Sequence, residues 1–387
     1  MSLTLTQDQA RALWDAGGFA VLTGLLPGSE VGLDGTLHAI ASFAGYKFVP
    51  PGVHALAWSR EGATLPLRTA VIKHWEPRER VALILEGEGV EMRSVDEAEL
   101  RALDPKLAPY PFADLERWKK LAAPISKTVL EAALPGIIDS LTPVQGEVDE
   151  MDEVLRKRAG QKEAGESGNK VALLDKPVDG ARIRLPVFDL KRSWPPGATG
   201  DGVTRWSRDK SDLWARTCST HGGPAELLGY TALAFILVTQ VWNAPALAAY
   251  RRLIALQCRA HAALAEPELF PNAFPSPQKE KGRETAIAFV DLLTAQISSL
   301  PDQAFAVEVP DLDVFYLDEI EVLRRGLGAA LAVRGWWGLA GRAQASWTRL
   351  QAVGRARGWE IGPLPQGDEE EDEDEEEGED APVVVEM

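Results

Sequence analysis

Cysteine is nearly absent from this chain of 387 residues, which contains only Cys218 and Cys258. Two thiols cannot form the disulfide framework that stabilises many small secreted domains. The first residues, MSLTLTQDQARAL, also lack the basic start and the apolar run of a signal peptide. We therefore expect an intracellular protein.

Long hydrophobic runs are missing as well. The longest apolar stretch, LLGYTALAFILVTQVW at 227–242, is interrupted by Gly229, Thr231, Thr239 and Gln240. It is shorter than the ~20 apolar residues that a membrane-spanning helix needs. The stretch predicts a buried helix of a soluble protein with no membrane partner.

Basic residues are not in excess. The formal net charge is -17, and the range 368–380 with Glu386 contributes thirteen acidic residues and no basic one. Without these residues, 41 basic side chains face 45 acidic ones. This balance indicates neither a nucleic-acid-binding protein nor a polyanion overall.

Catalytic motifs are missing too. The sequence has no G-x-S-x-G, H-E-x-x-H, G-x-x-x-x-G-K-[ST] or paired C-x-x-C pattern. GATGDG at 197–202 follows WPP rather than a strand, so a plain Gly/Pro connection is favoured over a phosphate loop. We expect no catalytic residue and no cofactor.

One residue pair has a metal-like spacing, because Cys258 and His261 lie three positions apart on a predicted helix. Zinc takes four protein ligands, or three and a water, and no second pair has a matching spacing. A buried cysteine beside a satisfied histidine is therefore favoured over a metal site. The other four histidines are interpreted as structural: His38, His54, His74 and His221.

The residues that are present indicate a globular protein with two or three domains, at ~150 residues per domain. Residues 1–142 predict a β-rich α+β domain, in which Gly- and Pro-containing turns separate short apolar stretches. In VHALAWS, at 53–59, both alternating faces are largely apolar, which predicts a strand covered on both sides. Strands are expected within 18–25, 29–40, 45–52, 53–59, 67–75 and 80–87, and helices at 96–102, 112–121 and 126–134.

Three further regions follow. Residues 143–183 are dense in charge and glycine, which predicts a flexible linker and a domain boundary. Residues 184–362 show apolar stripes at helical spacing, which predict an all-helical domain of five or six helices. Residues 363–387 form an acidic tail that is predicted to be disordered and that ends in a strand-forming segment.

The last predicted helix, GWWGLAGRAQASWTRLQAVGRARGW at 335–359, combines four arginines with four tryptophans. These side chains could stack on single-stranded RNA, which would make the chain an RNA-binding protein. A solvated arginine face beside core tryptophans is favoured, because the rest of the helical domain has no basic excess. A third possibility is a salt-sensitive contact with the protein's own acidic tail.

Several stretches together, in the same order, resemble the a1-cistron splicing factor (Aar-two) family. They are VGLDGTLHAIASFAGYKFVPPGVHALAWS, LDPKLAPYPFADLERWKKL with ISKTVLEAALP, FDLKRSWPPGATGDGVTRWSRDKSDL, and APVVVEM. The resemblance implies a β-sandwich-like N-terminal domain and a helical, VHS-like C-terminal domain. It also implies a non-enzymatic assembly chaperone of the U5 small nuclear ribonucleoprotein (snRNP) that acts in the cytoplasm and nucleus.

The resemblance further implies the partners. They are the RNase H-like and Jab/MPN-like domains of the scaffold protein Prp-eight in a U5 snRNP precursor, whose binding delays joining of the helicase Brr-two. In this family the C-terminal segment adds a strand to its partner, a mode in which main-chain hydrogen bonds give affinity. The matching partner-binding residues of this chain are Pro382, Val383, Val384, Val385 and Glu386.

Overall fold

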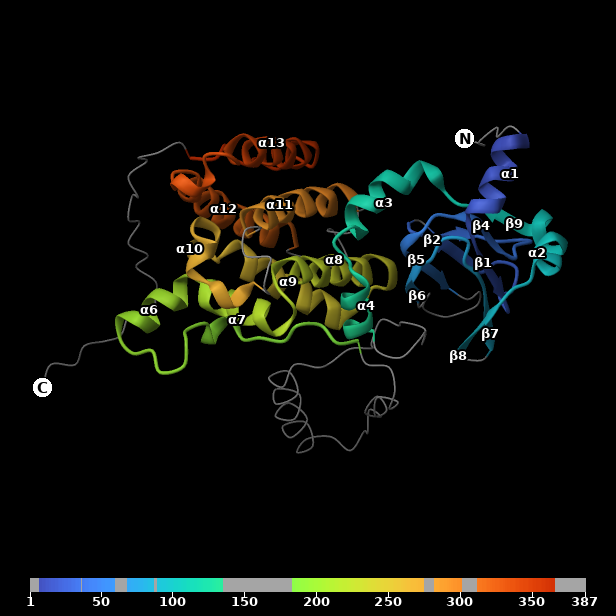
Figure 1. The fold of residues 1–387 in the computed structure, drawn as a ribbon, viewed down its shortest axis with the longest axis horizontal. Coiled ribbons are helices and arrows are strands. Elements are labelled where there is room, and N and C mark those ends of the chain that lie inside the picture. The colour runs from blue at the N-terminus through green and yellow to red at the C-terminus, as the bar shows by residue number, and fades with distance from the viewer. Residues whose placement is uncertain are drawn as a thin grey trace, which may run out of the picture.

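The computed structural model describes residues 7–35, 37–59, 68–86, 89–134, 183–274, 282–300 and 312–365. Strands of the N-terminal part form two sheets, and the C-terminal helices pack beside them in an elongated molecule (Figure 1). The predicted linker lies outside the described residues except for Ile183, and the tail does so after Pro365. The boundaries of the four predicted regions stay a prediction.

The first sheet is five-stranded and mixed, in the order β8-β7-β1-β4-β9. Strand β1 pairs antiparallel with β4 and parallel with β7, and β9 continues the sheet parallel to β4. Its strands are β1 (Gly18–Thr23), β4 (Gly45–Val49), β7 (Arg80–Glu86), β8 (Gly89–Ser94) and β9 (Leu107–Pro109).

The second sheet is four-stranded and antiparallel, in the order β3-β2-β5-β6. Its strands are β2 (Glu30–Leu33), β3 (His38–Ala39), β5 (Gly52–Ser59) and β6 (Arg68–Trp75). The two sheets enclose a common core to which β5 contributes Leu56 and Trp58. This packing confirms the predicted β-sandwich-like N-terminal part.

Two short helices cover the far face of the five-stranded sheet: α1 (Gln7–Ala16) and α2 (Glu97–Leu103). Trp14 and Leu100 pack there on Phe19 and Val21 of β1. Strand β1 is buried on both faces, which agrees with its unbroken apolar sequence FAVL.

The predicted strands are found at their expected places, but β8 and β9 are not among the predicted strands. Strand β8 alternates apolar Val90 and Met92 with polar Glu91 and Arg93, but it contains only two apolar residues. Strand β9 has only three residues and ends in Pro109, too short for a periodic pattern. Pairing with β7 and β4 makes them strands.

The remaining helices run from α3 to α13. They are α3 (Leu115–Ala122), α4 (Lys127–Ala133), α6 (Asp201–Arg208), α7 (Ser211–Thr220), α8 (Pro224–Val241), α9 (Ala244–Cys258), α10 (His261–Ala265), α11 (Gly282–Ser299), α12 (Leu312–Leu331) and α13 (Ala340–Ala356). Short 3-10 helices add Asp104–Lys106, Phe112–Asp114, Leu190–Arg192, Pro267–Leu269, Pro271–Ala273 and Arg334–Trp336.

Helix α8 lies at the centre of the molecule. Among the described helices it alone is long and apolar enough to span a membrane by length and composition, and most of it is buried inside the protein. It packs on α9, α11, α3 and α4 and on strands β5 and β6. The predicted buried helix is therefore confirmed, and it contacts both parts of the fold.

The second sheet turns its outer face toward the helices. Val53, Ala55 and Ala57 of β5 belong to one core with α8, whereas Leu56 and Trp58 face the sandwich. The expected cover on both sides of this strand is thus confirmed. Helix α3 is fastened to the same strand, because Trp118 Nε1 donates a hydrogen bond to the Val53 carbonyl over 2.6 Å.

The chain leaves and re-enters the described structure at adjoining places. The Arg184 N–H donates to the Ala133 carbonyl at the end of α4, over 2.8 Å. Ile183 is buried in the same core as α4 and α8. The two ends of the segment 135–182 are therefore held together.

The helical part differs from its prediction in detail. The described residues from 184 to 362 contain eight α-helices rather than five or six, because short helices carry too little periodic sequence to be recognised. One of the predicted apolar stripes, formed by Tyr250, Leu253, Leu256, Ala260 and Leu264, is interrupted by the break between α9 and α10. The last helix begins at Ala340, so that Trp336 and Trp337 precede it.

Candidate functional site

The predicted partner-binding residues, Pro382 to Glu386, lie outside the described residues. Most residues of the other family-like stretches and of the arginine-rich segment lie within the described part of the chain. They form two polar networks inside the fold and one arginine-rich outer surface.

The first network joins Asp34, His54 and Tyr110. Asp34 Oδ2 accepts a hydrogen bond from Tyr110 Oη over 2.7 Å and contacts His54 Nδ1. Asp34 Oδ1 accepts from the Ala55 N–H over 2.8 Å. The second ring nitrogen of His54 lies 2.8 Å from the Pro50 carbonyl. Asp34, His54, Ala55 and Tyr110 are buried and Pro50 is half-buried, so this network joins segments that are far apart in sequence inside the fold.

Two of the stretches that carry the family resemblance meet in this network: Asp34 and His54 lie in VGLDGTLHAIASFAGYKFVPPGVHALAWS, and Tyr110 lies in LDPKLAPYPFADLERWKKL. Asp34 has a positive φ of 61°, in the turn that follows β2. Burial and the Asp34 carboxylate raise the pKa of Tyr110 well above its ordinary value and that of Tyr46 to about 12. The network therefore stabilises the sandwich and offers no group to an outside substrate.

The second network surrounds Asp209, Lys210 and Ser211 at the start of α7. Asp209 Oδ1 accepts from the Ser211 N–H over 2.8 Å, and Asp209 Oδ2 accepts from the Ala262 N–H over 3.0 Å. Ser211 Oγ accepts from the Ala263 N–H over 2.9 Å. Ala262 and Ala263 lie in the first turn of α10, just after the break between α9 and α10. Because Asp209 and Ser211 accept hydrogen bonds from their N–H groups, these contacts separate α10 from α9. Helix α7 begins at Ser211 with Lys210 at the N-cap position, and Asp209 one residue earlier holds the Ser211 N–H at the helix start.

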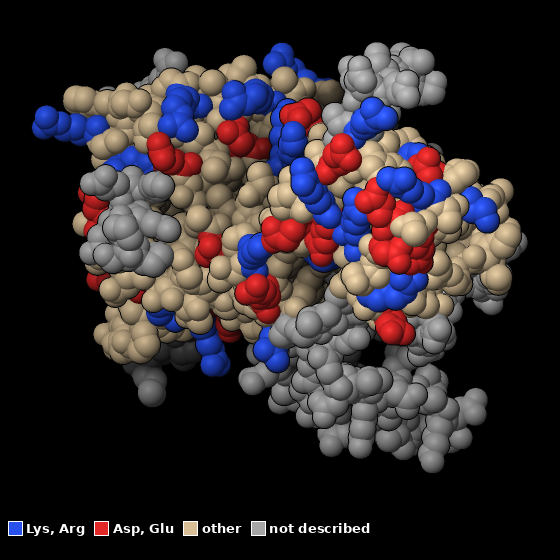
Figure 2. All heavy atoms as spheres, turned by 45° about the vertical axis from the view of Figure 1, so that its right-hand side comes forward, with Lys and Arg blue, Asp and Glu red and all other residues tan. Residues whose placement is uncertain are grey.

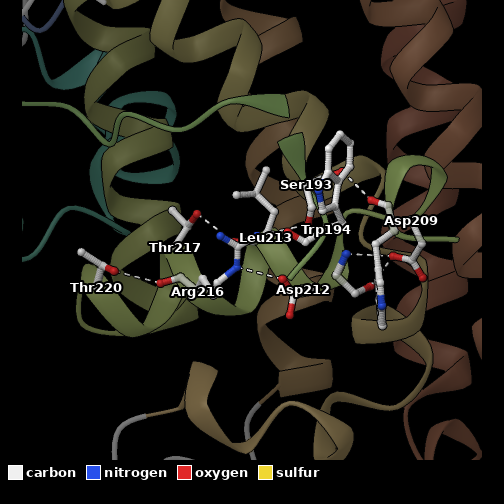
Figure 3. A network of polar contacts seen from close by, with 10 residues as sticks. Ser193, Trp194, Asp209, Asp212, Leu213, Arg216, Thr217 and Thr220 are labelled. Carbon is white, nitrogen blue, oxygen red and sulfur yellow. Dashed lines mark hydrogen bonds and ion pairs between the residues drawn. The ribbon is translucent and has the colours of Figure 1, made fainter. Parts of the chain in front are cut away.

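The same network also holds the segment KRSWPP, residues 191–196, in place against α7. Lys210 Nζ donates to Ser193 Oγ over 3.0 Å, and burial lowers the pKa of this lysine. Arg216 of α7 is fixed by Asp212 over 2.8 Å and donates to the carbonyls of Ser193 and Trp194, each over 3.2 Å (Figure 3). This part of the family resemblance is again explained by folding.

Cys258 and His261 do not form a metal site. Cys258 ends α9 and His261 begins α10, so the two residues do not share a helix as predicted. Burial raises the pKa of the Cys258 thiol well above its ordinary value, which disfavours a thiolate ligand. Across the described ranges, no group of three His, Cys, Asp or Glu side chains could hold a metal ion.

The tryptophans of the arginine-rich segment belong mostly to the core. Trp336 and Trp347 are fully buried and donate to the carbonyls of Leu264 and Gly362, each over 2.9 Å. Trp359 is nearly buried, and only Trp337, 66% exposed, could stack on a base. The geometry favours the interpretation of a solvated arginine face over stacked RNA.

The rest of the surface carries mixed charges. Figure 2 shows acidic and basic side chains interspersed on the N-terminal part, whereas Lys and Arg gather along the upper edge of the helical part, the side of α13 in Figure 1. Large exposed apolar side chains are scattered; Trp242, for example, ends α8 and stacks with Arg68 at 5.1 Å.

Known proteins resemble both parts of the chain. The family model of the AAR2 N-terminal domain matches residues 16–135, and that of the AAR2 C-terminal repeat region matches residues 185–361. The chain is 28% identical over 324 residues to Protein AAR2 homolog of Macaca fascicularis, covering 76% of this chain and 83% of the relative. It is 25% identical over 361 residues to Protein AAR2 homolog of Mus musculus, covering 83% and 85%.

Proposed function

Because the chain belongs to the AAR2 family, matched in both of its folded parts, we propose that it is a non-enzymatic assembly factor of the U5 snRNP. Membership of this family indicates a role in splicing-related snRNP assembly. The match over both parts is the observation that carries the proposal.

The proposed partner is Prp-eight, bound through its RNase H-like and Jab/MPN-like domains in a U5 snRNP precursor, so that Brr-two joins later. This activity belongs to the cytoplasm and nucleus. The two internal networks support a binding role, because they use the motif residues to hold a rigid surface rather than to perform chemistry. Direct RNA contact is the second candidate, and the burial of Trp336 and Trp347 speaks against it.

The proposed tail contact is strand addition by Pro382 to Glu386. An extended peptide on a sheet edge uses its main chain for affinity and alternate side chains for specificity. Val383 and Val385 would point to one side of the added strand and Val384 to the other. The acidic residues before them keep this apolar segment solvated until a sheet edge is available.

Deletion of Ala381–Met387 is the test of this contact. We expect at least about tenfold weaker binding to the paired Prp-eight domains in calorimetry, because a strand of main-chain hydrogen bonds is lost. The matched control replaces Val383, Val384 and Val385 by threonine, which keeps a strand former but removes apolar contacts. An unchanged affinity of the deletion variant would disprove strand addition.

Affinity purification from the source cell tests the broader proposal. Recovery of Prp-eight without Brr-two is the expected result. Recovery of neither U5 component would overturn the assembly function, whatever the tail does.

A further inference from the structure

A stretch of 38 residues, 322–359, contains seven arginines and no acidic residue. In the fold it forms the end of α12, the 3-10 helix Arg334–Trp336 and all of α13, at the outside of the molecule (Figure 1). Five of the seven arginines have exposed side chains, and we call them the arginine face: Arg325, Arg334, Arg342, Arg349 and Arg355.

Nearby carboxylates do not balance this face. Arg342 pairs with Glu284 over 3.2 Å and Arg349 with Asp291 over 2.8 Å. Arg325, 74% exposed, shares Glu321 with Arg324. Within the described ranges Arg334 and Arg355 form no ion pair. The face therefore has a surplus of positive charge.

The chain leaves the described structure beside this face. After α13 it runs back along α12: the Gln351 amide donates to the Ile361 carbonyl over 3.0 Å and Arg324 donates to the Pro363 carbonyl over 2.9 Å. The ring of Pro365 lies against Gly328, where an added Cβ would be 2.4 Å from Pro365 Cδ. Pro365 is thereby fixed less than one helical turn from Arg325 along α12.

The acidic tract 368–380 begins three residues after this fixed point. Thirteen extended residues reach about 45 Å, whereas the 17 residues of α13 span only about 25 Å. The tract is therefore long enough to run the whole length of α13. A short tether also gives it an effective concentration on the order of millimolar, which an unlinked polyanion seldom matches.

We propose that the acidic tract 368–380 docks on the arginine face and shields it from other polyanions. Its twelve carboxylates supply the charge that the face lacks. Both sides are solvated, so the contact is governed by long-range electrostatics and weakens as salt screens it. This intramolecular contact goes beyond the proposed assembly function and does not depend on it.

Spin-label distance measurements on the full chain test the proposal. Labels are attached at Gly341→Cys, where an added Cβ meets no atom within 4 Å, and at Gly378→Cys, the one uncharged position of the tract. Both native cysteines are buried, so the labels select the introduced ones. We expect a narrow distance distribution at low salt that becomes at least about twofold broader in 1 M NaCl, where the screening length is ~3 Å.

A triple variant tests the arginines themselves. We expect the distance distribution at low salt to be as broad as that of the parent in 1 M NaCl when three arginines are reversed together: Arg325→Glu, Arg334→Glu and Arg355→Glu. The matched control is Arg101→Glu, which reverses a similarly exposed arginine on α2 and should leave it narrow. Deletion of Ala381–Met387 should also leave it narrow, which separates this test from that of strand addition. A low-salt distribution that is already broad, or one unchanged by the triple substitution, would overturn the proposal.

The alternative occupant of the arginine face is RNA, and binding of a twelve-nucleotide single-stranded RNA tests it. We expect the parent protein to bind it at least about tenfold more weakly than a variant whose tract carries Asn and Gln in place of Asp and Glu. Equal and tight binding by both proteins would make the arginine face an RNA surface and would contradict shielding.

Discussion

At the scale of single residues, the family-like motifs are explained by hydrogen bonds. His54 is expected to be structural from its sequence context, and its contact with Asp34 agrees with that interpretation. The sequence could not identify the partners, because Asp34 lies 20 positions from His54 and 76 from Tyr110. Periodicity reports which face a residue occupies but not which distant polar group it meets.

His261 gives a prediction at this scale. Burial lowers its pKa below the ordinary 6.5, and its Nε2 has no hydrogen-bond partner. The folded state therefore resists protonation, so stability is fully present above pH 6.5 and is lost as the pH falls toward the lowered pKa. We expect the free energy of unfolding to fall less between pH 7 and 5 in His261→Asn than in the parent.

Urea unfolding at a series of pH values measures this difference. His38→Asn, at an exposed position of β3, serves as the control for the loss of an imidazole. Parallel curves for His261→Asn and the parent would contradict the prediction. His221, whose pKa burial also lowers, is present in all three proteins and does not affect the comparison.

At the scale of helices and strands, the long elements and several short ones, such as α2 and α4, were predictable, whereas elements defined by distant contacts were not. The apolar run at 227–242 is recognisable as a buried helix, and the alternation in VHALAWS as a strand covered on both sides. The break between α9 and α10 is invisible in sequence, because Asp209 and Ser211 of another segment create it. Strands β8 and β9 likewise depend on their neighbours.

Gly229 of α8 provides the prediction for this scale. An added Cβ would lie 2.7 Å from the Pro124 carbonyl oxygen and 2.9 Å from Val129 Cγ2. Although alanine favours a helix by up to ~1 kcal/mol over glycine, overpacking costs about 1–3 kcal/mol. We therefore expect Gly229→Ala to destabilise the protein in urea unfolding.

Gly341→Ala is the matched control, because α13 leaves open space at this position. It should stabilise the protein by up to about 1 kcal/mol, as expected for an exposed helical site. If Gly229→Ala behaved in the same way as Gly341→Ala, the close packing of α8 on the turn before α4 would be disproved.

At the scale of the whole molecule, two family segments share one core. That core includes Ala55 and Ala57 of β5 together with α3, α4 and α8. The sequence indicated two parts but could not show how they join, since alanines on a strand do not reveal the helix that covers them. The resemblance supplied the class of partner, and the terminal strand residues remain a prediction.

This shared core predicts one cooperative thermal transition for the parent protein. Ala57→Glu places an unpaired charge between β5 and α8 and should lower stability by at least about 2 kcal/mol. Ala39→Glu, on the exposed strand β3, should have little effect. Calorimetry measures both variants, and two separate transitions in the parent would show that the parts fold independently.

The hydrogen bond between the Arg184 N–H and the Ala133 carbonyl holds the two ends of the segment 135–182 next to each other. The segment 135–182 starts and finishes at one place, so its length does not set the geometry of the parts that it connects. Each doubling of the length of a loop whose ends are held together costs only about 0.6 kcal/mol in loop-closure entropy. A fluorescent protein inserted there should leave the rest of the molecule intact, and relatives are free to lengthen, shorten or replace this segment.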